Sequence, residues 1–289
     1  MIDYVIPMVF PDDQQWQRDL TRAFGWNHSD SVRYRSWGME ALLVECIRKF
    51  MPWVRDIIVL LARESQRQPW MKDVRVVYHR EFIPEAYLPT FNSRTIEMFL
   101  HRIPGLSERF LYGNDDMFPI APLREEDFFV GDMPCQNMTV KPYPENPNNF
   151  QLACMAGLNF VAEEFGQHYT KTWLKNGHSI APILRQVCEH LWERGEQEIL
   201  KSISPFREPK NFNQYIYAWW QYFAGLSIDR TPNRFLLTAN NYSPQAMTGV
   251  ILDKKVQIVC INDHEDCNDI QPYVDATTAA IRQRLTATA

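Results

Sequence analysis

Short apolar runs alternate with amphipathic, helix-like segments along the first half of this chain. The apolar runs cover residues 2–9, 56–62, 74–78 and 110–112. Between them, apolar side chains recur at the spacing of a helix face, as at Leu43, Ile47 and Phe50. Strands that alternate with helices usually form a mainly parallel sheet with helices on both faces. The sequence therefore predicts an α/β fold.

The middle of the chain has a different character. Residues 134–149 are rich in proline and asparagine and show little periodicity, which is typical of a segment that leaves the sheet. Residues 167–226 are aromatic and helical in pattern, and residues 258–285 return to a strand and a final helix. We predict one domain over residues 1–289, in which residues 1–133 and 250–289 form the α/β core and residues 134–249 form a mainly helical insertion.

The apolar run at residues 110–112 ends abruptly in Gly113-Asn114-Asp115-Asp116. Ligands of open α/β sheets collect at the carboxyl ends of the strands. Two adjacent carboxylates at such an end are suited to hold a divalent cation against a phosphate. A solvated turn explains the same residues, because asparagine and aspartate are ordinary turn formers. The run alone does not decide between these two interpretations.

Other predicted strands also end in polar residues. Asp12-Asp13, His79 and Asn262-Asp263-His264 each follow an apolar run. If the sheet is parallel, these clusters meet at one edge and form a binding crevice. The sequence contains no phosphate-binding P-loop, no dinucleotide-binding glycine fingerprint and no serine-hydrolase nucleophile elbow.

Composition narrows the class of protein further. The net charge of −5 argues against a general nucleic-acid binder, which usually needs a basic surface. The six cysteines form no C-x-x-C pair, so we expect reduced core residues rather than structural zinc. No uninterrupted apolar stretch is long enough to span a membrane and no signal peptide opens the chain, so we expect a cytoplasmic protein. Peripheral docking at the inner face of the membrane and a homo-oligomer stay open.

Four stretches carry a family resemblance. The first is IDYVIPMVFPDDQQW (residues 2–16), and the second begins at Arg33 and includes LPTFNSRTIEMFLHRIPGLSERFLYGNDDMF (residues 88–118). The third contains Gly177-His178 and SPFR (residues 204–207), and the fourth is VCINDH (residues 259–264). In this order they resemble the four sequence blocks of the Stealth family of sugar-1-phosphate transferases. One departure is Phe10-Pro11, where relatives usually carry aspartate or asparagine followed by glycine.

The resemblance implies a fold and a reaction. The sheet would be Rossmann-like, of the glycosyltransferase-A type. The enzyme would move a sugar-1-phosphate, as in a hexosamine-1-phosphate, from a UDP-sugar to a hydroxyl of a surface polysaccharide. The product would be a phosphodiester, UMP would leave, and Mg²⁺ or Mn²⁺ would assist. Two alternatives are a metal-dependent glycosyltransferase that moves the sugar alone and a non-catalytic sugar-binding relative.

The resemblance also implies catalytic residues. Asp13 matches an aspartate of the first block and would deprotonate the acceptor or face the metal, although its position also suits a helix N-cap. His178 matches the third-block histidine and would act as general base or phosphate partner, because imidazole titrates near neutrality. Without the resemblance it reads as a surface loop residue. Arg207 would stabilise phosphate charge through its guanidinium fork, or form a structural ion pair.

The remaining implied residues bind metal and substrate. The carboxylates expected to face the metal are Asp115, Asp116 and Asp263. The residues expected to bind substrate are Asn92, Ser93, His101, Arg102, Asn114 and Asn262. Asn92 and Ser93 can also cap the start of a helix, and His101 and Arg102 can simply pack.

Overall fold

The computed structural model describes residues 1–25 and 31–287, and its centre is a five-stranded sheet in the order β10-β4-β1-β2-β3. The strands of this sheet are β1 (Ile2–Pro7), β2 (Ile57–Leu61), β3 (Arg75–Tyr78), β4 (Arg109–Tyr112) and β10 (Ala181–Leu184). The four N-terminal strands are parallel, and β10 joins β4 in the antiparallel sense. The predicted mainly parallel α/β sheet is confirmed.

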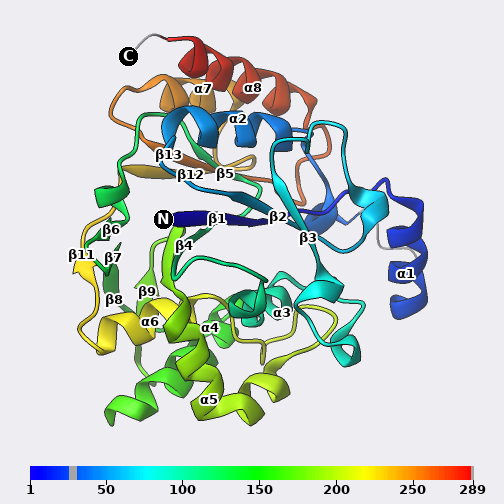
Figure 1. Cartoon of the computed structure of the whole chain (residues 1–289). Helices are drawn as coiled ribbons and strands as arrows, with labels where there is room; N and C mark the ends of the chain where they lie inside the picture. The colour runs from blue at the N-terminus through cyan, green and yellow to red at the C-terminus, as the bar shows by residue number, and fades with distance from the viewer. Residues whose placement is uncertain (26–30, 288–289) are drawn as a thin grey trace.

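Helices cover both faces of this sheet (Figure 1). On one face lie α2 (Glu40–Phe50), α7 (Pro244–Leu252) and α8 (Gln271–Thr286), and on the other lie α3 (Ser93–Met98), α4 (Asn149–Ala162), α5 (Arg185–Ser202) and α6 (Tyr215–Phe223). Helix α1 (Gln14–Phe24) stands beyond the edge at β3. β1 and β2 are buried along almost their whole length because both faces are covered.

A second sheet brings the end of the chain back to the first half. It has the order β12-β13-β5 and consists of β5 (Met117–Pro119), β12 (Arg234–Thr238) and β13 (Ile258–Asn262). The backbone N–H of Ile261 donates to the carbonyl of Asp116 at 2.9 Å. This pairing places the end of β13 beside the polar segment that follows β4.

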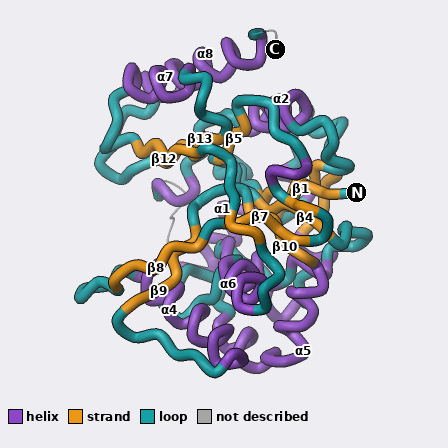
Figure 2. The backbone as a smooth tube through the Cα atoms, turned by 90° about the vertical axis from the view of Figure 1, so that its left-hand side faces the viewer, coloured by secondary structure: helices purple, strands orange, loops and turns teal. Residues whose placement is uncertain are grey.

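Two smaller sheets lie on the side of the molecule that faces the viewer in Figure 2. They are formed by β6 (Phe129–Val130), β7 (Met133–Gln136) and β11 (Ile228–Asp229), and by β8 (Met138–Pro142) with β9 (Thr172–Asn176). β8 is exposed along most of its length.

Residues 134–249, which we predicted as a mainly helical insertion, also complete both larger sheets. This segment supplies β10 to the central sheet and β12 to the second sheet. The reason is strand pairing at the sheet edges. β10 and β12 pair with the backbone N–H and C=O groups on the otherwise open edges of β4 and β13. Among the residues that the structure describes, no helix is long and apolar enough to cross a bilayer.

Candidate active site

A cavity of about 850 Å³ opens where β1, β4 and β13 end. Its lining also includes the segment of residues 31–40 and parts of the loops around residues 178 and 207. Eight of the predicted site residues line it: Ser93, Asn114, Asp115, Asp116, His178, Arg207, Asn262 and Asp263. The expected convergence of strand ends therefore occurs, although β13 reaches the cavity from a separate sheet.

Asp115 and Asp116 carry the acidic part of the lining. Burial, together with the neighbouring Asp116, raises the pKa of Asp115 to about 8. Burial also raises the pKa of Asp116, and no described residue donates a hydrogen bond to its Oδ1, which solvent does not reach. A buried carboxylate oxygen without a donor is costly. These two carboxylates are therefore suited to a positively charged ligand.

The residues around the pair fit a hard divalent cation. Asn114 and Asn262 add amide oxygens to the same cavity, and Mg²⁺ and Mn²⁺ prefer carboxylate and amide oxygens. Asp263 is differently engaged. Both of its carboxylate oxygens accept from Arg35, at 2.5 Å each. This bidentate ion pair already pairs the charge of Asp263, whose role as a metal ligand stays a prediction.

His178 lies on the loop between β9 and β10 and faces the same acidic group. Donor atoms of His178, Asp116 and Cys260 all lie within 4.8 Å of one another. The Nδ1 atom of His178 is 3.2 Å from the hydroxyl oxygen of Tyr215, whose pKa is raised by burial. This hydrogen bond fixes the ring, because the partner of one imidazole nitrogen determines the orientation and tautomer of the other.

Gly177 makes room for a further cation beside this histidine. A Cβ atom at position 177 would lie 1.6 Å from Nη2 of Arg234. The guanidinium of Arg234 therefore packs directly on the Gly177 backbone. Burial lowers the pKa of Arg234, and the nearby Tyr215 raises it. The Gly-His pair of the third block thus combines a close-approach glycine with the cavity histidine.

Arg207 and Arg33 form the basic part of the lining. Nη2 of Arg207 donates to Oγ of Ser93 at 2.8 Å, which orients the guanidinium. Burial lowers the pKa of Arg33, and the positive charge of Arg207 lowers it further. Two arginines that line the same cavity are suited to bind a phosphate or diphosphate.

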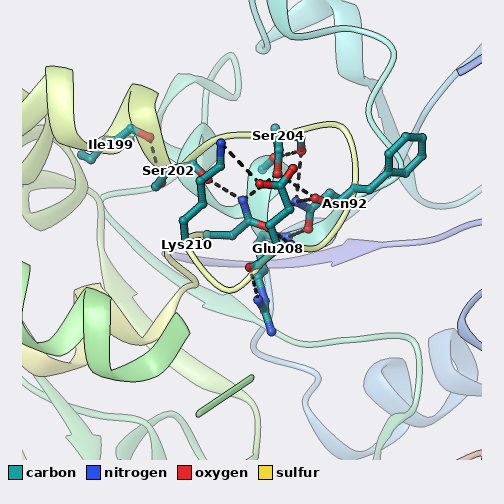
Figure 3. Close-up of polar contacts among 10 residues, drawn as sticks. Asn92, Ile199, Ser202, Ser204, Glu208 and Lys210 are labelled. Atoms are coloured by element: carbon teal, nitrogen blue, oxygen red, sulfur yellow. Dashed lines mark hydrogen bonds and ion pairs between the residues drawn. The ribbon is translucent and has the colours of Figure 1, made fainter. Parts of the chain in front are cut away.

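Asn92 positions the loop that carries Arg207 (Figure 3). Its Nδ2 donates to the carbonyls of Ser204 and Phe206 and to Oδ1 of Asn211, each at 3.0 Å. Its Oδ1 accepts from the backbone N–H of Arg94 and caps α3. Asn92 is fully buried and does not line the cavity, unlike the substrate contact that the sequence suggested. Its amide atoms are all used within the protein.

Asp13 lies outside this cavity. Its Oδ1 accepts from the backbone N–H of Trp16 at 2.6 Å and caps α1, so the helix-cap interpretation is confirmed. The carboxylate borders a second hollow of about 510 Å³, which shares Ser36 with the first cavity. The structure therefore does not bring Asp13 together with His178 and Arg207.

His101 and Arg102 also lie away from the cavity. The guanidinium of Arg102 stacks 4.5 Å above the ring of Trp192, and the ring of His101 lies 5.5 Å from the same indole. Burial and the charge of Arg102 lower the pKa of His101 to about 4, which keeps the imidazole neutral. These contacts are packing contacts between the end of the α3 region and α5, and neither residue reaches the predicted substrate position.

Comparison of the sequence with known proteins shows which family the chain belongs to. The family model described as Stealth protein CR2, conserved region 2, matches residues 33–136. The chain is 31% identical to the receptor polysaccharide phosphotransferase WefC of Streptococcus oralis, over 98% of this chain and 97% of the relative. It is 30% identical to the capsular polysaccharide phosphotransferase WcwK of Streptococcus pneumoniae, with the same coverage. The chain belongs to the Stealth family.

One solved structure has a distant likeness to this Stealth chain. The galactosyltransferase LgtC, in complex with donor and acceptor sugar analogues, aligns with 100% of this chain and 98% of its own, at 13% identity and a TM-score of 0.43. At this distance the likeness carries no further argument.

Several residues of this Stealth site were not predicted, and four of them matter most for its chemistry. They are Arg33, Arg35, Tyr215 and Cys260. Arg33 and Arg35 stand at the start of the second block, so their position in the block was the available signal. Tyr215 and Cys260 look like core residues in the sequence, because one lies in an aromatic helix and the other in an apolar strand. Only the fold brings them to His178 and Asp116.

Proposed function

We propose that this Stealth protein transfers a sugar-1-phosphate from a UDP-sugar to a hydroxyl of a surface polysaccharide and releases UMP. The observation that supports this most is that one cavity combines the carboxylates of Asp115 and Asp116, the guanidinium groups of Arg33 and Arg207, and the imidazole of His178. Phosphoryl transfer needs charge neutralisation, a positioned acceptor and a proton acceptor. A hexosamine is the sugar we favour.

The diphosphate of the donor would be bound by both kinds of charge in the cavity. Arg207, held by Ser93, and Arg33 would bind phosphate oxygens directly. Asp115 and Asp116, with the amide oxygens of Asn114 and Asn262, would hold Mg²⁺ or Mn²⁺. When bound, such a cation neutralises diphosphate charge and stabilises the leaving phosphate.

The acceptor proton would be taken by His178. In the step we propose, the acceptor oxygen forms a bond to the phosphorus next to the sugar. The bond from that phosphorus to the bridging oxygen breaks, UMP leaves with the bridging oxygen, and the acceptor proton moves to the imidazole. Tyr215 orients the ring through Nδ1. Because the Asp13 carboxylate caps α1 outside the cavity, its catalytic role stays a prediction to be tested separately.

The whole chain would work as one catalytic domain. His178 and Arg207 come from the segment of residues 134–249, whereas Asp115 and Asp116 come from the N-terminal core. A site divided in this way needs both parts together, so neither part is expected to act alone.

The test is nucleotide release from a purified protein. Incubation with UDP-N-acetylglucosamine, Mg²⁺ and a polysaccharide acceptor should release UMP. His178→Ala should remove the release, and Arg207→Lys should lower kcat/KM by about a hundredfold, because an ammonium cannot reproduce the guanidinium fork. Arg102→Lys is the matched control outside the cavity and should stay within about twofold. Release of UDP instead of UMP would favour sugar transfer alone, and no release would favour a binding protein.

A further inference from the structure

Asp116, His178 and Cys260 form a mixed set of metal donors inside the candidate active site. One carboxylate oxygen, one imidazole nitrogen and one sulfur lie within 4.8 Å of one another. They come from the segment after β4, the loop before β10 and the middle of β13. Three separate parts of the fold therefore bring together oxygen, nitrogen and sulfur donors.

This donor set does not suit the same cation as the oxygen ligands described above. Mg²⁺ takes oxygen ligands in octahedral geometry, whereas Zn²⁺ readily accepts cysteine sulfur, histidine nitrogen and carboxylate oxygen in a tetrahedron. Donor atoms of a tetrahedral zinc site lie about 3.5 Å apart, given metal–ligand bonds of about 2.0–2.3 Å. The three donor atoms lie within 4.8 Å of one another, so zinc binding would bring them closer by up to about 1.3 Å.

Two buried polar atoms near the set support a ligand there. The Oδ1 atom of Asp116 and the hydroxyl of the fully buried Tyr4 have no hydrogen-bond partner among the described residues. The Tyr4 hydroxyl lies against Gly113, where a Cβ atom would approach it to 2.3 Å. Unpartnered buried polar groups are uncommon in native proteins, and several together indicate a bound ion or water.

Cys260 is a buried thiol. Burial and the charge of Asp116 raise its pKa well above the usual range, and the residue is 2% exposed. A bound dication would lower the pKa of this thiol, because coordination removes the thiol proton and releases it to solvent.

We propose that Asp116, His178 and Cys260 bind Zn²⁺, in addition to the Mg²⁺ or Mn²⁺ binding proposed above for this site. We propose also that zinc binding inhibits the enzyme. The inhibitory half rests on the proposed function, because it requires His178 to be the proton acceptor. Zinc occupies the lone pair of the imidazole, and a coordinated histidine cannot accept the acceptor proton. The fourth ligand position is left to water.

Cobalt tests the binding half without any reference to activity. Co²⁺ replaces Zn²⁺ in such sites and gives a near-ultraviolet charge-transfer band only when a thiolate is a ligand. Titration of the whole protein with Co²⁺ should produce this band, and added Zn²⁺ should remove it. Cys260→Ser should abolish the band. Cys267→Ser, which changes the cysteine with the greatest exposure among the described residues, should leave it unchanged.

A second variant covers misfolding of Cys260→Ser. His178→Ala changes a partly exposed loop residue, so the fold should persist, and the Co²⁺ dissociation constant should rise at least about tenfold. No band in the unmodified protein, or loss of the band in Cys267→Ser rather than Cys260→Ser, overturns the zinc site.

UMP release tests the inhibitory half. Stoichiometric Zn²⁺, added with Mg²⁺ in large excess, should suppress the release. A protein that gives the cobalt band but never releases UMP contradicts the proposed function and leaves the metal site standing. A protein that releases UMP undisturbed by bound Zn²⁺ contradicts the inhibitory half alone.

Discussion

The Nδ1 atom of His178 lies 3.2 Å from the hydroxyl oxygen of Tyr215. The two residues come from the loop after β9 and from the first turn of α6, which are far apart in the sequence. Tyr215 is buried, so its hydroxyl holds a fixed position. The histidine that we propose as proton acceptor therefore has one nitrogen oriented by the protein, which leaves the other for chemistry.

Tyr215→Phe tests this orientation. The ring and its packing remain, but the hydroxyl is lost, so kcat should fall about tenfold while KM for the donor changes little. Tyr217→Phe is a matched control on the same helix. Its hydroxyl donates to the Glu97 carbonyl at 2.8 Å, so that variant should lose about 1 kcal/mol of stability and keep its kcat. Equal kcat losses in both variants would refute a special role for Tyr215.

Asn92→Ala separates a positioning role from substrate contact. The substitution leaves two carbonyls and the Asn211 side chain without their donor, so the free energy of unfolding should fall by about 3 kcal/mol. Urea denaturation measures the change. Asn137→Ala removes a solvent-exposed hydrogen bond to Asp229 and should stay within about 0.5 kcal/mol. Unchanged stability with a raised donor KM would instead support the substrate contact that the sequence suggested.

Gly113→Ala tests the close packing under the acidic segment. The new Cβ would lie 2.3 Å from the hydroxyl and 2.9 Å from Cζ of Tyr4, a buried residue of β1 that has little room to move. We expect a loss of about 2–3 kcal/mol, measured by thermal or urea unfolding. Gly249→Ala on α7 is the control. No atom of the described residues lies within 4 Å of its new Cβ, so it should be neutral or stabilising by up to about 1 kcal/mol.

The buried imidazole of His79 predicts a loss of stability in acid. Burial lowers the pKa of His79 from its ordinary value of 6.5 to about 4. Above pH 6.5 both folded and unfolded chains carry the neutral ring. As the pH falls from 6.5 towards 4, the unfolded chain takes up a proton that the folded chain excludes, so folding weakens. The loss in the free energy of unfolding reaches about 3 kcal/mol once the pH falls below the folded-state pKa.

Urea denaturation at pH 7 and pH 5 measures this effect. His79→Leu should reduce the difference between the two pH values, because the variant has no ring to protonate. His101 contributes in the same window, so part of the slope should remain. A variant with the full slope of the unmodified protein would show that His79 does not titrate as a buried group.

The fold was predictable where local signals agreed. The apolar runs predicted β1 to β4. The abrupt change to polar residues after β4 predicted that Asp115 and Asp116 lie at a strand end. Asn92 and Asp13 were recognisable as cap residues, and both cap a helix. These features depend on neighbours within a few residues, which the sequence displays directly.

Long-range pairing was not predictable from such signals. β10 pairs with the edge of β4 in the antiparallel sense, and the four residues of β10 contain no pattern that predicts this partner. Arg35 and Asp263 are 228 positions apart, and the sequence did not suggest their ion pair. The buried position of Asn92 was not predictable for the same reason, since the loop to which it donates lies more than a hundred residues away in the sequence.

Phosphorus NMR of the product tests the central claim most directly. The reaction mixture contains the protein, UDP-N-acetylglucosamine, Mg²⁺ and the polysaccharide acceptor. Transfer of a sugar-1-phosphate predicts a new phosphodiester resonance on the polysaccharide, with UMP appearing in equal amount. A mixture that accumulates UDP, with no phosphodiester on the polysaccharide, would contradict the account.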